Sequence, residues 1–126
     1  MAYLVSVVDD DASFRQALSS LLQSLGYTVA AFASAEEFLG SGRIDETACL
    51  ISDVHMTGMS GFELQARLSE AGHRKPIIFV AASPGEKARE QAIKSGALAF
   101  LGKPFSEDRL IALLAKIERD HGVAEH

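Results

Sequence analysis

The sequence has little cysteine, no long apolar run and no excess of positive charge. Its single cysteine, Cys49, cannot form an internal disulfide, which fits the reducing cytoplasm. No apolar run reaches the length of a membrane span, and the start of the chain lacks the basic and apolar segments of a signal peptide. The net charge of -5 argues against nucleic acid as a direct partner. We therefore expect a cytoplasmic protein that contacts neither membranes nor nucleic acid directly.

The chain is long enough to bury a substantial core in one domain. It has 126 residues, of which 48% are hydrophobic, and it contains no internal repeat, low-complexity segment or linker. We expect one domain over residues 1–122, followed by a short C-terminal tail over residues 123–126.

Five short apolar runs alternate with segments that carry helical signals. The runs are almost continuously apolar, as in strands of a parallel sheet whose two faces are both covered. The helical segments begin at capping residues such as Asp11, Ser34 and Ser60, and most end at a glycine. This alternation predicts an α/β fold of the doubly wound, flavodoxin-like class, with a five-stranded parallel sheet in the order 2-1-3-4-5 and helices on both faces. The expected strands cover residues 3–8, 27–32, 47–52, 76–81 and 97–101.

The fourth helical segment is unusually polar. The residues from Ser83 to Glu86 form its predicted capping box, with Pro84 at the first helical position, where a missing N–H costs nothing. Only Ala88, Ala92 and Ile93 are expected to face the core. We therefore expect this helix, which ends near residue 95, to be held loosely.

Charged residues stand where three of the predicted strands end. Asp9 and Asp10 follow the first strand, Asp53 ends the central one, and Lys103 follows the fifth. An aspartate after a strand is often only a turn residue or a helix cap. The predicted strand order, however, places the first and third strands side by side at the switch point, where ligands bind in such sheets. We therefore expect these charged side chains to form one site.

Three carboxylates that converge on one point need a counter-cation. Mg²⁺ suits them, because it takes oxygen ligands and is commonly held by one or two carboxylates together with a phosphate. Zinc does not, since the only cysteine has no partner and the four histidines are scattered along the chain. With Lys103 as a second positive charge, such a site can stabilise phosphoryl transfer, with Asp53 as the nucleophile that becomes an acyl phosphate.

These motifs resemble those of the response-regulator receiver domains of two-component signalling, over nearly the whole chain. The matching motifs are the acidic pair Asp9-Asp10, the phosphoacceptor with its following loop over residues 53–61, and Lys103-Pro104. The resemblance implies that the peptide bond before Pro104 is cis, a geometry that proline makes accessible.

The resemblance also implies the role of each site residue. Asp10 and Asp53 bind Mg²⁺ directly, the backbone carbonyl of His55 adds a ligand, and Asp9 acts through water. Lys103 pairs with the phosphoryl oxygens. Such a domain is a phosphoacceptor with self-catalysed phosphorylation and dephosphorylation rather than an enzyme of ordinary turnover.

The partners that the resemblance implies are a phosphoryl donor and a receiver of the signal. The donor is a histidine kinase or a phosphotransfer protein. The signal passes through the last two helices and the fifth strand to an output partner or output domain, and formation of a homodimer is left open.

Three residues depart from the family pattern. Ala81 stands at the end of the fourth strand, where the family has a threonine or serine that binds a phosphoryl oxygen. Phe100 replaces the tyrosine often found at the switch position of the fifth strand, and Thr57 replaces the usual proline. Ser83 could substitute for the missing hydroxyl, although we favour its role as a helix cap. These departures leave the chemistry at Asp53 intact but weaken the expected coupling of phosphorylation to shape.

Two alternatives to a phosphorylation-driven receiver stay open at this stage. Ala81 favours a receiver-like interaction module whose output needs no phosphate. The spacing of Asp9 and Asp11 also matches the nucleophile motif of haloacid-dehalogenase phosphatases. That class needs a late pair of acids to hold Mg²⁺, however, and Asp108 and Asp120 are too isolated to serve. We therefore favour the phosphoacceptor receiver.

Overall fold

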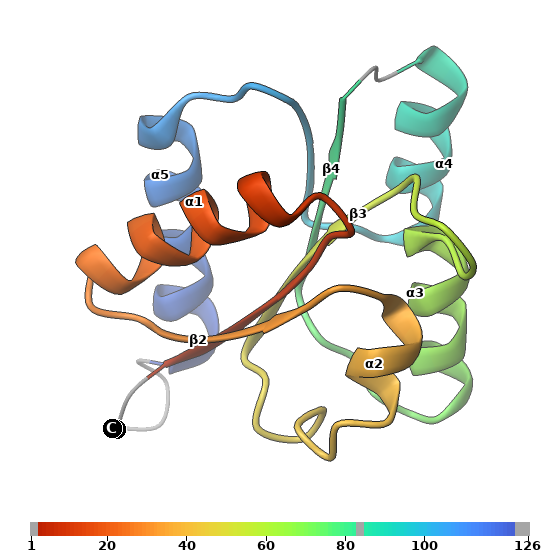
Figure 1. Ribbon diagram of the computed structural model, residues 1–126, viewed down its shortest axis with the longest axis horizontal. Helices are drawn as coiled ribbons and strands as arrows, with labels where there is room; N and C mark the ends of the chain where they lie inside the picture. Colours follow the sequence, from red (N-terminus) through yellow and green to blue (C-terminus); the bar gives the residue numbers. More distant parts are fainter. Residues whose placement is uncertain (1–2, 83–84, 123–126) are drawn as a thin grey trace.

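Five parallel strands form one sheet in the order β2-β1-β3-β4-β5, as Figure 1 shows. This computed structural model describes residues 3–82 and 85–122, so the tail predicted over residues 123–126 lies outside it. The predicted fold class and strand order are confirmed. The strands are β1 (Leu4–Val8), β2 (Thr28–Phe32), β3 (Cys49–Asp53), β4 (Ile77–Ala81) and β5 (Ala99–Gly102).

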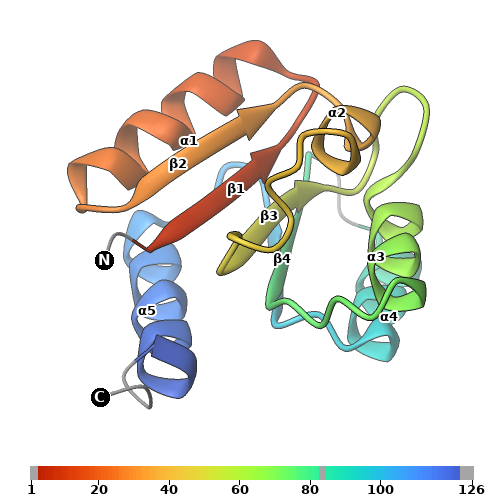
Figure 2. The same ribbon diagram turned by 90° about the horizontal axis from the view of Figure 1, so that it is seen from below.

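Helices cover both faces of the sheet. α1 and α5 lie together on one face, while α2, α3 and α4 lie on the other, as the two views in Figures 1 and 2 agree. No helix within the described ranges is long and apolar enough to cross a membrane. The helices are α1 (Ala12–Ser24), α2 (Ala35–Leu39), α3 (Gly61–Glu70), α4 (Glu86–Ser95) and α5 (Glu107–Ile117), and a π-helical turn follows over Glu118–Gly122.

The core lies in two layers, one on each side of the sheet. Every residue of β1, β3 and β4 is buried, which explains why these strands are almost continuously apolar. Beneath α1 and α5, the layer contains Leu18, Leu22, Leu110 and Leu114. Beneath the other three helices, it contains Phe38, Leu64, Leu68 and Phe79. Each layer holds its helices against the sheet. Because each helix starts at the end of a loop that follows a strand, the core also fixes the position of these loops.

The predicted helix caps are largely present. The carboxylate of Asp11 accepts hydrogen bonds from the N–H groups of Ser13 and Phe14 at the start of α1. Ser60 and Glu63 form the full capping box of α3, each side chain accepting from the other residue's N–H. These bonds satisfy N–H groups that have no partner within their own helix.

The structure corrects the prediction for α4. The helix begins at Glu86, later than predicted, and Gly85 is its N-cap without a side-chain hydrogen bond. The capping box predicted from Ser83 involves residues 83 and 84, which lie outside the described residues. Ile93 was expected in the core but is 70% exposed, whereas Ala92 is buried. Ala88 and Ala92, four residues apart, share the inward face, and Ile93 is turned away from it.

Gly61 allows α3 to begin directly against the end of β3. A Cβ atom at this position would lie 2.4 Å from the backbone oxygen of Asp53 and 3.2 Å from the ring of Phe79. Because both neighbours are buried, neither atom can move aside without disturbing the core. The absence of a side chain at Gly61 therefore sets where the loop carrying residues 54–60 returns to the sheet.

Replacing Gly61 with alanine should destabilise the fold by about 2 kcal/mol, because the added methyl overpacks the end of β3. Urea unfolding followed by circular dichroism measures this change. Gly40→Ala is the matched control, since the nearest atom to its added Cβ would lie at 3.5 Å, an ordinary van der Waals contact. Equal unfolding midpoints for the two variants would show that the close approach at Gly61 has no energetic consequence.

Candidate functional site

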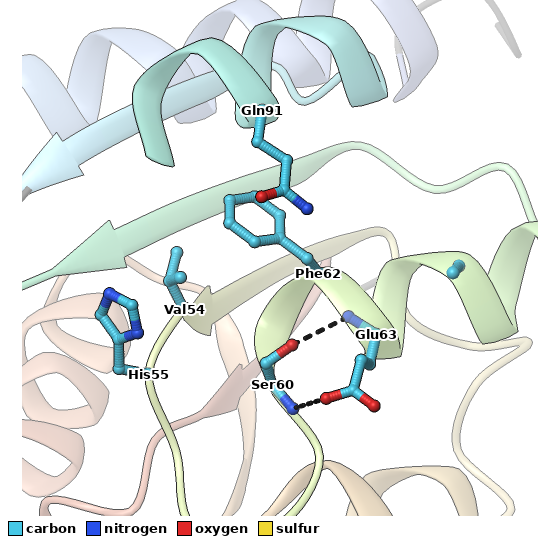
Figure 3. A pocket seen from close by; sticks show the side chains of 7 residues that line it. Val54, His55, Ser60, Phe62, Glu63 and Gln91 are labelled. Atoms are coloured by element: carbon cyan, nitrogen blue, oxygen red, sulfur yellow. Dashed lines mark hydrogen bonds between the residues drawn. The ribbon is translucent and has the colours of Figure 1, made fainter. Parts of the chain in front are cut away.

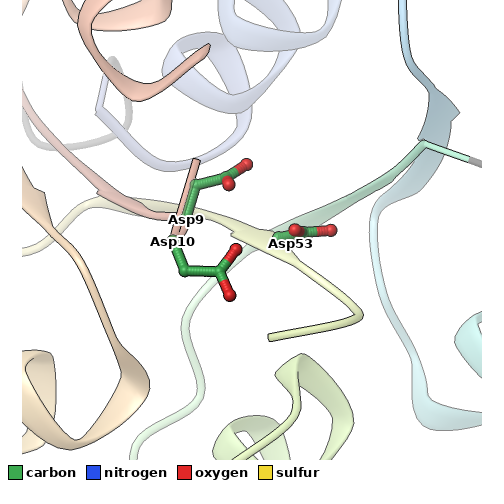
Figure 4. Close-up of side chains that lie close together, drawn as sticks. All are labelled: Asp9, Asp10 and Asp53. Carbon is green, nitrogen blue, oxygen red and sulfur yellow. The ribbon is translucent and has the colours of Figure 1, made fainter. Parts of the chain in front are cut away.

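Three carboxylates meet at one edge of the sheet. Asp9 and Asp10 follow β1, and Asp53 is the last residue of β3, the strand beside it. One carboxylate oxygen from each residue lies within 4.8 Å of the others, and Figure 4 shows the three side chains at the neighbouring strand ends. The predicted convergence of these residues is confirmed, and their roles stay predictions.

Lys103 supplies a positive charge to this cluster. Its Nζ donates a hydrogen bond to Oδ2 of Asp9 at 2.8 Å and lies 3.6 Å from Oδ2 of Asp53. The lysine side chain is only 14% exposed and that of Asp9 only 1% exposed. Oδ1 of Asp9 accepts a second hydrogen bond, from the N–H of Asp11. Asp9 is therefore a buried charge that is both paired and hydrogen-bonded, the condition under which burial is tolerated.

Two further contacts hold Lys103 in place. Its backbone N–H donates to the carbonyl oxygen of Ala81 at 2.8 Å, which fixes the start of the β5–α5 loop. Its ammonium lies 4.1 Å from the ring centroid of Phe14, which packs edge-on against Phe105. The bond between Lys103 and Pro104 is cis, as the resemblance implied. The contact with Phe14 was missed from the sequence, because Phe14 falls in the apolar stripe of α1 like an ordinary core residue.

Burial raises the pKa of Asp53 above its ordinary value, and the nearby charge of Asp9 raises it further. The ammonium of Lys103 and the backbone N–H of His55 act in the opposite direction, but they do not cancel the rise. Among the residues that the structure describes, three carboxylates face one ammonium, so the site carries an excess of negative charge. The donors are all oxygens, and such a set fits a hard divalent cation rather than zinc.

The loop from β3 to α3 borders the cluster. The exposed carboxylate of Asp10 accepts a hydrogen bond from the N–H of Thr57 at 3.0 Å. The side chain of His55 is exposed on the same loop and faces a separate hollow of about 480 Å³ between α3 and α4. Figure 3 shows Phe62 and Gln91 at this hollow, with the capping box of α3 on its rim. None of the three clustered acids lines it.

The comparisons with known proteins agree with this architecture. Residues 5–115 match the family model described as the response regulator receiver domain. The chain belongs to this family. It is 42% identical over 118 residues to nodulation protein W of Bradyrhizobium diazoefficiens, covering 93% of this chain and 52% of that protein. It is 40% identical over 125 residues to the transcriptional regulatory protein TdiR of Thauera aromatica, covering 98% of this chain and 55% of that protein.

A solved structure supports the same assignment. The response regulator receiver protein from Burkholderia phymatum is 38% identical, with a TM-score of 0.79, covering 91% of this chain and 94% of that one. The receiver chain thus spans about half the length of the two curated relatives named above. It is a receiver domain of two-component systems, and the relatives that it resembles are bacterial.

The two residues predicted at switch positions, Ala81 and Phe100, are both buried. Ala81 ends β4 with no exposed surface and offers no hydroxyl to the site. Phe100 on β5 is 6% exposed, and the guanidinium carbon of Arg89 from α4 lies 5.3 Å from its ring centroid. The proposed substitute hydroxyl of Ser83 lies outside the described residues.

The phosphatase alternative finds no support in this receiver domain. Asp11, which the haloacid-dehalogenase motif requires in the site, is exposed and caps α1 instead. Asp108 is exposed in the first turn of α5.

In the absence of divalent cations, Asp53→Asn should melt at a higher temperature than wild type at neutral pH. The raised pKa means that the native state binds the Asp53 proton more tightly than the unfolded state does, so ionised Asp53 destabilises the fold. The advantage of the variant should shrink as the pH falls through the raised pKa toward the ordinary value of 3.8.

Thermal unfolding in EDTA at several pH values measures this effect, with Glu90→Gln on the exposed face of α4 as control. A difference between Asp53→Asn and wild type that does not change with pH would contradict the prediction.

Proposed function

We propose that this receiver domain accepts a phosphoryl group on Asp53 in a Mg²⁺-dependent reaction. The observation that carries this proposal is the position of the Asp53 carboxylate, which has Asp9 and Asp10 on one side and the Lys103 ammonium 3.6 Å away. The donor is a histidine kinase or a phosphotransfer protein of a two-component system. A carboxylate oxygen of Asp53 attacks phosphorus, the bond to the donor breaks, and an acyl phosphate forms.

The metal ligands in this proposal are Asp10, Asp53 and the backbone carbonyl of His55, with Asp9 acting through water. When bound, Mg²⁺ supplies positive charge that offsets the carboxylates and the incoming phosphoryl oxygens. Asp9 holds the ammonium of Lys103 within reach of Asp53 before the reaction. Lys103 then pairs with a phosphoryl oxygen, which places a fixed positive charge where negative charge develops.

The output of the domain passes through α4, β5 and α5 to a partner or to a domain outside this chain. The relatives named above are about twice as long as this chain, and one is a transcriptional regulatory protein, which supports an output in gene regulation. A cytoplasmic location fits that output, and the single buried cysteine agrees with it.

A second candidate function is a receiver that binds its partner with little phosphorylation-driven switching. The observation in its favour is Ala81, which provides no hydroxyl where the mechanism needs one. A hydrogen bond to a charged group is worth roughly 1.5–3 kcal/mol, so losing it reduces the activated population about tenfold or more.

Acetyl phosphate should phosphorylate the domain only when Mg²⁺ is present. Intact-mass spectrometry should then find one added phosphoryl group on wild type and none on Asp53→Asn. Asp108→Asn, which changes an exposed carboxylate on α5, is the matched control and should label like wild type. Equal labelling of Asp53→Asn and wild type would rule out Asp53 as the acceptor.

Ala81→Thr should strengthen the response of α4 and Phe100 to beryllofluoride, because the added hydroxyl supplies a contact that differs between the two states. Amide chemical shifts with and without beryllofluoride measure the response. Ala82→Thr adds the same hydroxyl at an exposed neighbouring position, and Ala81→Ser repeats the test with a smaller side chain in the buried site.

The expected result is larger shifts in both Ala81 variants than in wild type or Ala82→Thr. If wild type already shows shifts as large as those of Ala81→Thr, a group other than the residue-81 hydroxyl carries the coupling.

A further inference from the structure

Two backbone N–H groups of the β3–α3 loop are held by carboxylates from other elements. Oδ2 of Asp10, after β1, accepts from the N–H of Thr57 at 3.0 Å. Oε2 of Glu36, in α2, accepts from the N–H of Met59 at 3.3 Å. Gly58 lies between them with a φ of 83°, and a Cβ there would lie 2.8 Å from Oε2 of Glu36. The loop is thus attached at neighbouring points to two different parts of the fold.

The bond from Thr57 exists because residue 57 is not proline. Proline has no backbone N–H, so it could not donate to Asp10. Thr57 is exposed, and no hydrogen bond of its side chain is found within the described part of the chain. What this residue contributes to the site is therefore its main-chain N–H, which any residue other than proline would provide equally.

The orientation of the Asp10 carboxylate depends on this one N–H, whereas the carboxylates of Asp9 and Asp53 each have two partners. Asp9 is buried and held by Lys103 and by the N–H of Asp11. Asp53 is buried beside Lys103 and the N–H of His55. Asp10 is exposed, and within residues 3–82 and 85–122 its carboxylate accepts only from Thr57. Repulsion from the two buried carboxylates favours rotation of Asp10 into solvent, and the hydrogen bond opposes that rotation.

We propose that the backbone N–H of Thr57 is a positioning group for Asp10, holding one carboxylate oxygen so that the other stays directed into the cluster for a divalent cation. This inference rests on the proposed role of Asp10 as a direct Mg²⁺ ligand. Hydrogen bonds to ligating carboxylates orient them, and their loss commonly lowers metal affinity about 10- to 100-fold. Because Asp10 is exposed, we expect a smaller effect here.

Calorimetric titration with Mg²⁺ compares wild type, Thr57→Pro and Thr57→Ala. Thr57→Pro removes the N–H and should raise the Kd for Mg²⁺ about three- to tenfold. Thr57→Ala keeps the N–H, loses only the exposed side chain, and should bind within twofold of wild type. Melting temperatures in EDTA compare the stability of the metal-free variants. If both variants bind Mg²⁺ more weakly than wild type by the same factor, the effect comes from the threonine side chain and the proposal is overturned.

A second measurement needs no variant. The Thr57 amide should be protected from hydrogen exchange in metal-free wild type and should stay protected at saturating Mg²⁺, because the proposed bond persists when the metal binds. If the amide becomes exchange-labile on saturation, the N–H competes with the metal instead of positioning its ligand, and the proposal fails. This result stands even if Thr57→Pro does not fold.

The Mg²⁺ titration distinguishes failure of the proposed function from failure of the positioning role alone. If wild type shows no Mg²⁺ binding, the proposed function and this inference are both wrong. If wild type binds Mg²⁺ and Thr57→Pro binds it as tightly or more tightly, only the positioning role is overturned.

Discussion

The excess of negative charge at one edge of the sheet is the constraint on which the rest of the site depends. Asp9 and Asp53 are buried, Asp10 lies within 4.8 Å of both, and Lys103 is the cation that contacts the two buried acids. Burial in a medium of low dielectric strengthens both the repulsion and the ion pair. The fold therefore keeps a site that one further divalent cation would stabilise, and the ion pair between Asp9 and Lys103 offsets part of the repulsion among its carboxylates.

The chain reaches this arrangement through its strand order and through close packing at the loops. The order β2-β1-β3-β4-β5 makes β1 and β3 neighbours, although more than 40 residues separate Asp9 from Asp53 in the sequence. Gly61 lets α3 begin against the backbone of Asp53, and the N–H of Lys103 bonds to the end of β4. The loops that carry the charged groups are thus attached to the most buried strands, which limits how far repulsion can separate them.

Much of the fold and of the candidate site could be predicted from the sequence, because both depend on patterns local to single helices and strands. Apolar runs ending in aspartate or followed by lysine indicated which residues would share the sheet edge, and strand order followed from general rules of connection. Individual hydrogen bonds between distant parts of the chain could not be predicted in this way. The bonds from Thr57 to Asp10 and from Met59 to Glu36 involve main-chain N–H groups, which leave no trace in a side-chain pattern. Ile93 was placed in the core for its hydrophobicity, but the inward face of α4 is set by Ala88 and Ala92.

The protonation state of the Asp53 carboxyl group shows whether a divalent cation neutralises the uncompensated negative charge at this edge of the sheet. Carbon-13 NMR of the Asp53 side-chain carboxyl, followed against pH with and without Mg²⁺, measures its pKa in both conditions. We expect a pKa above the ordinary value in metal-free protein, because of burial and Asp9, and a lower pKa in Mg²⁺, because a nearby cation favours the ionised form. An ordinary pKa that does not respond to Mg²⁺ would contradict this expectation.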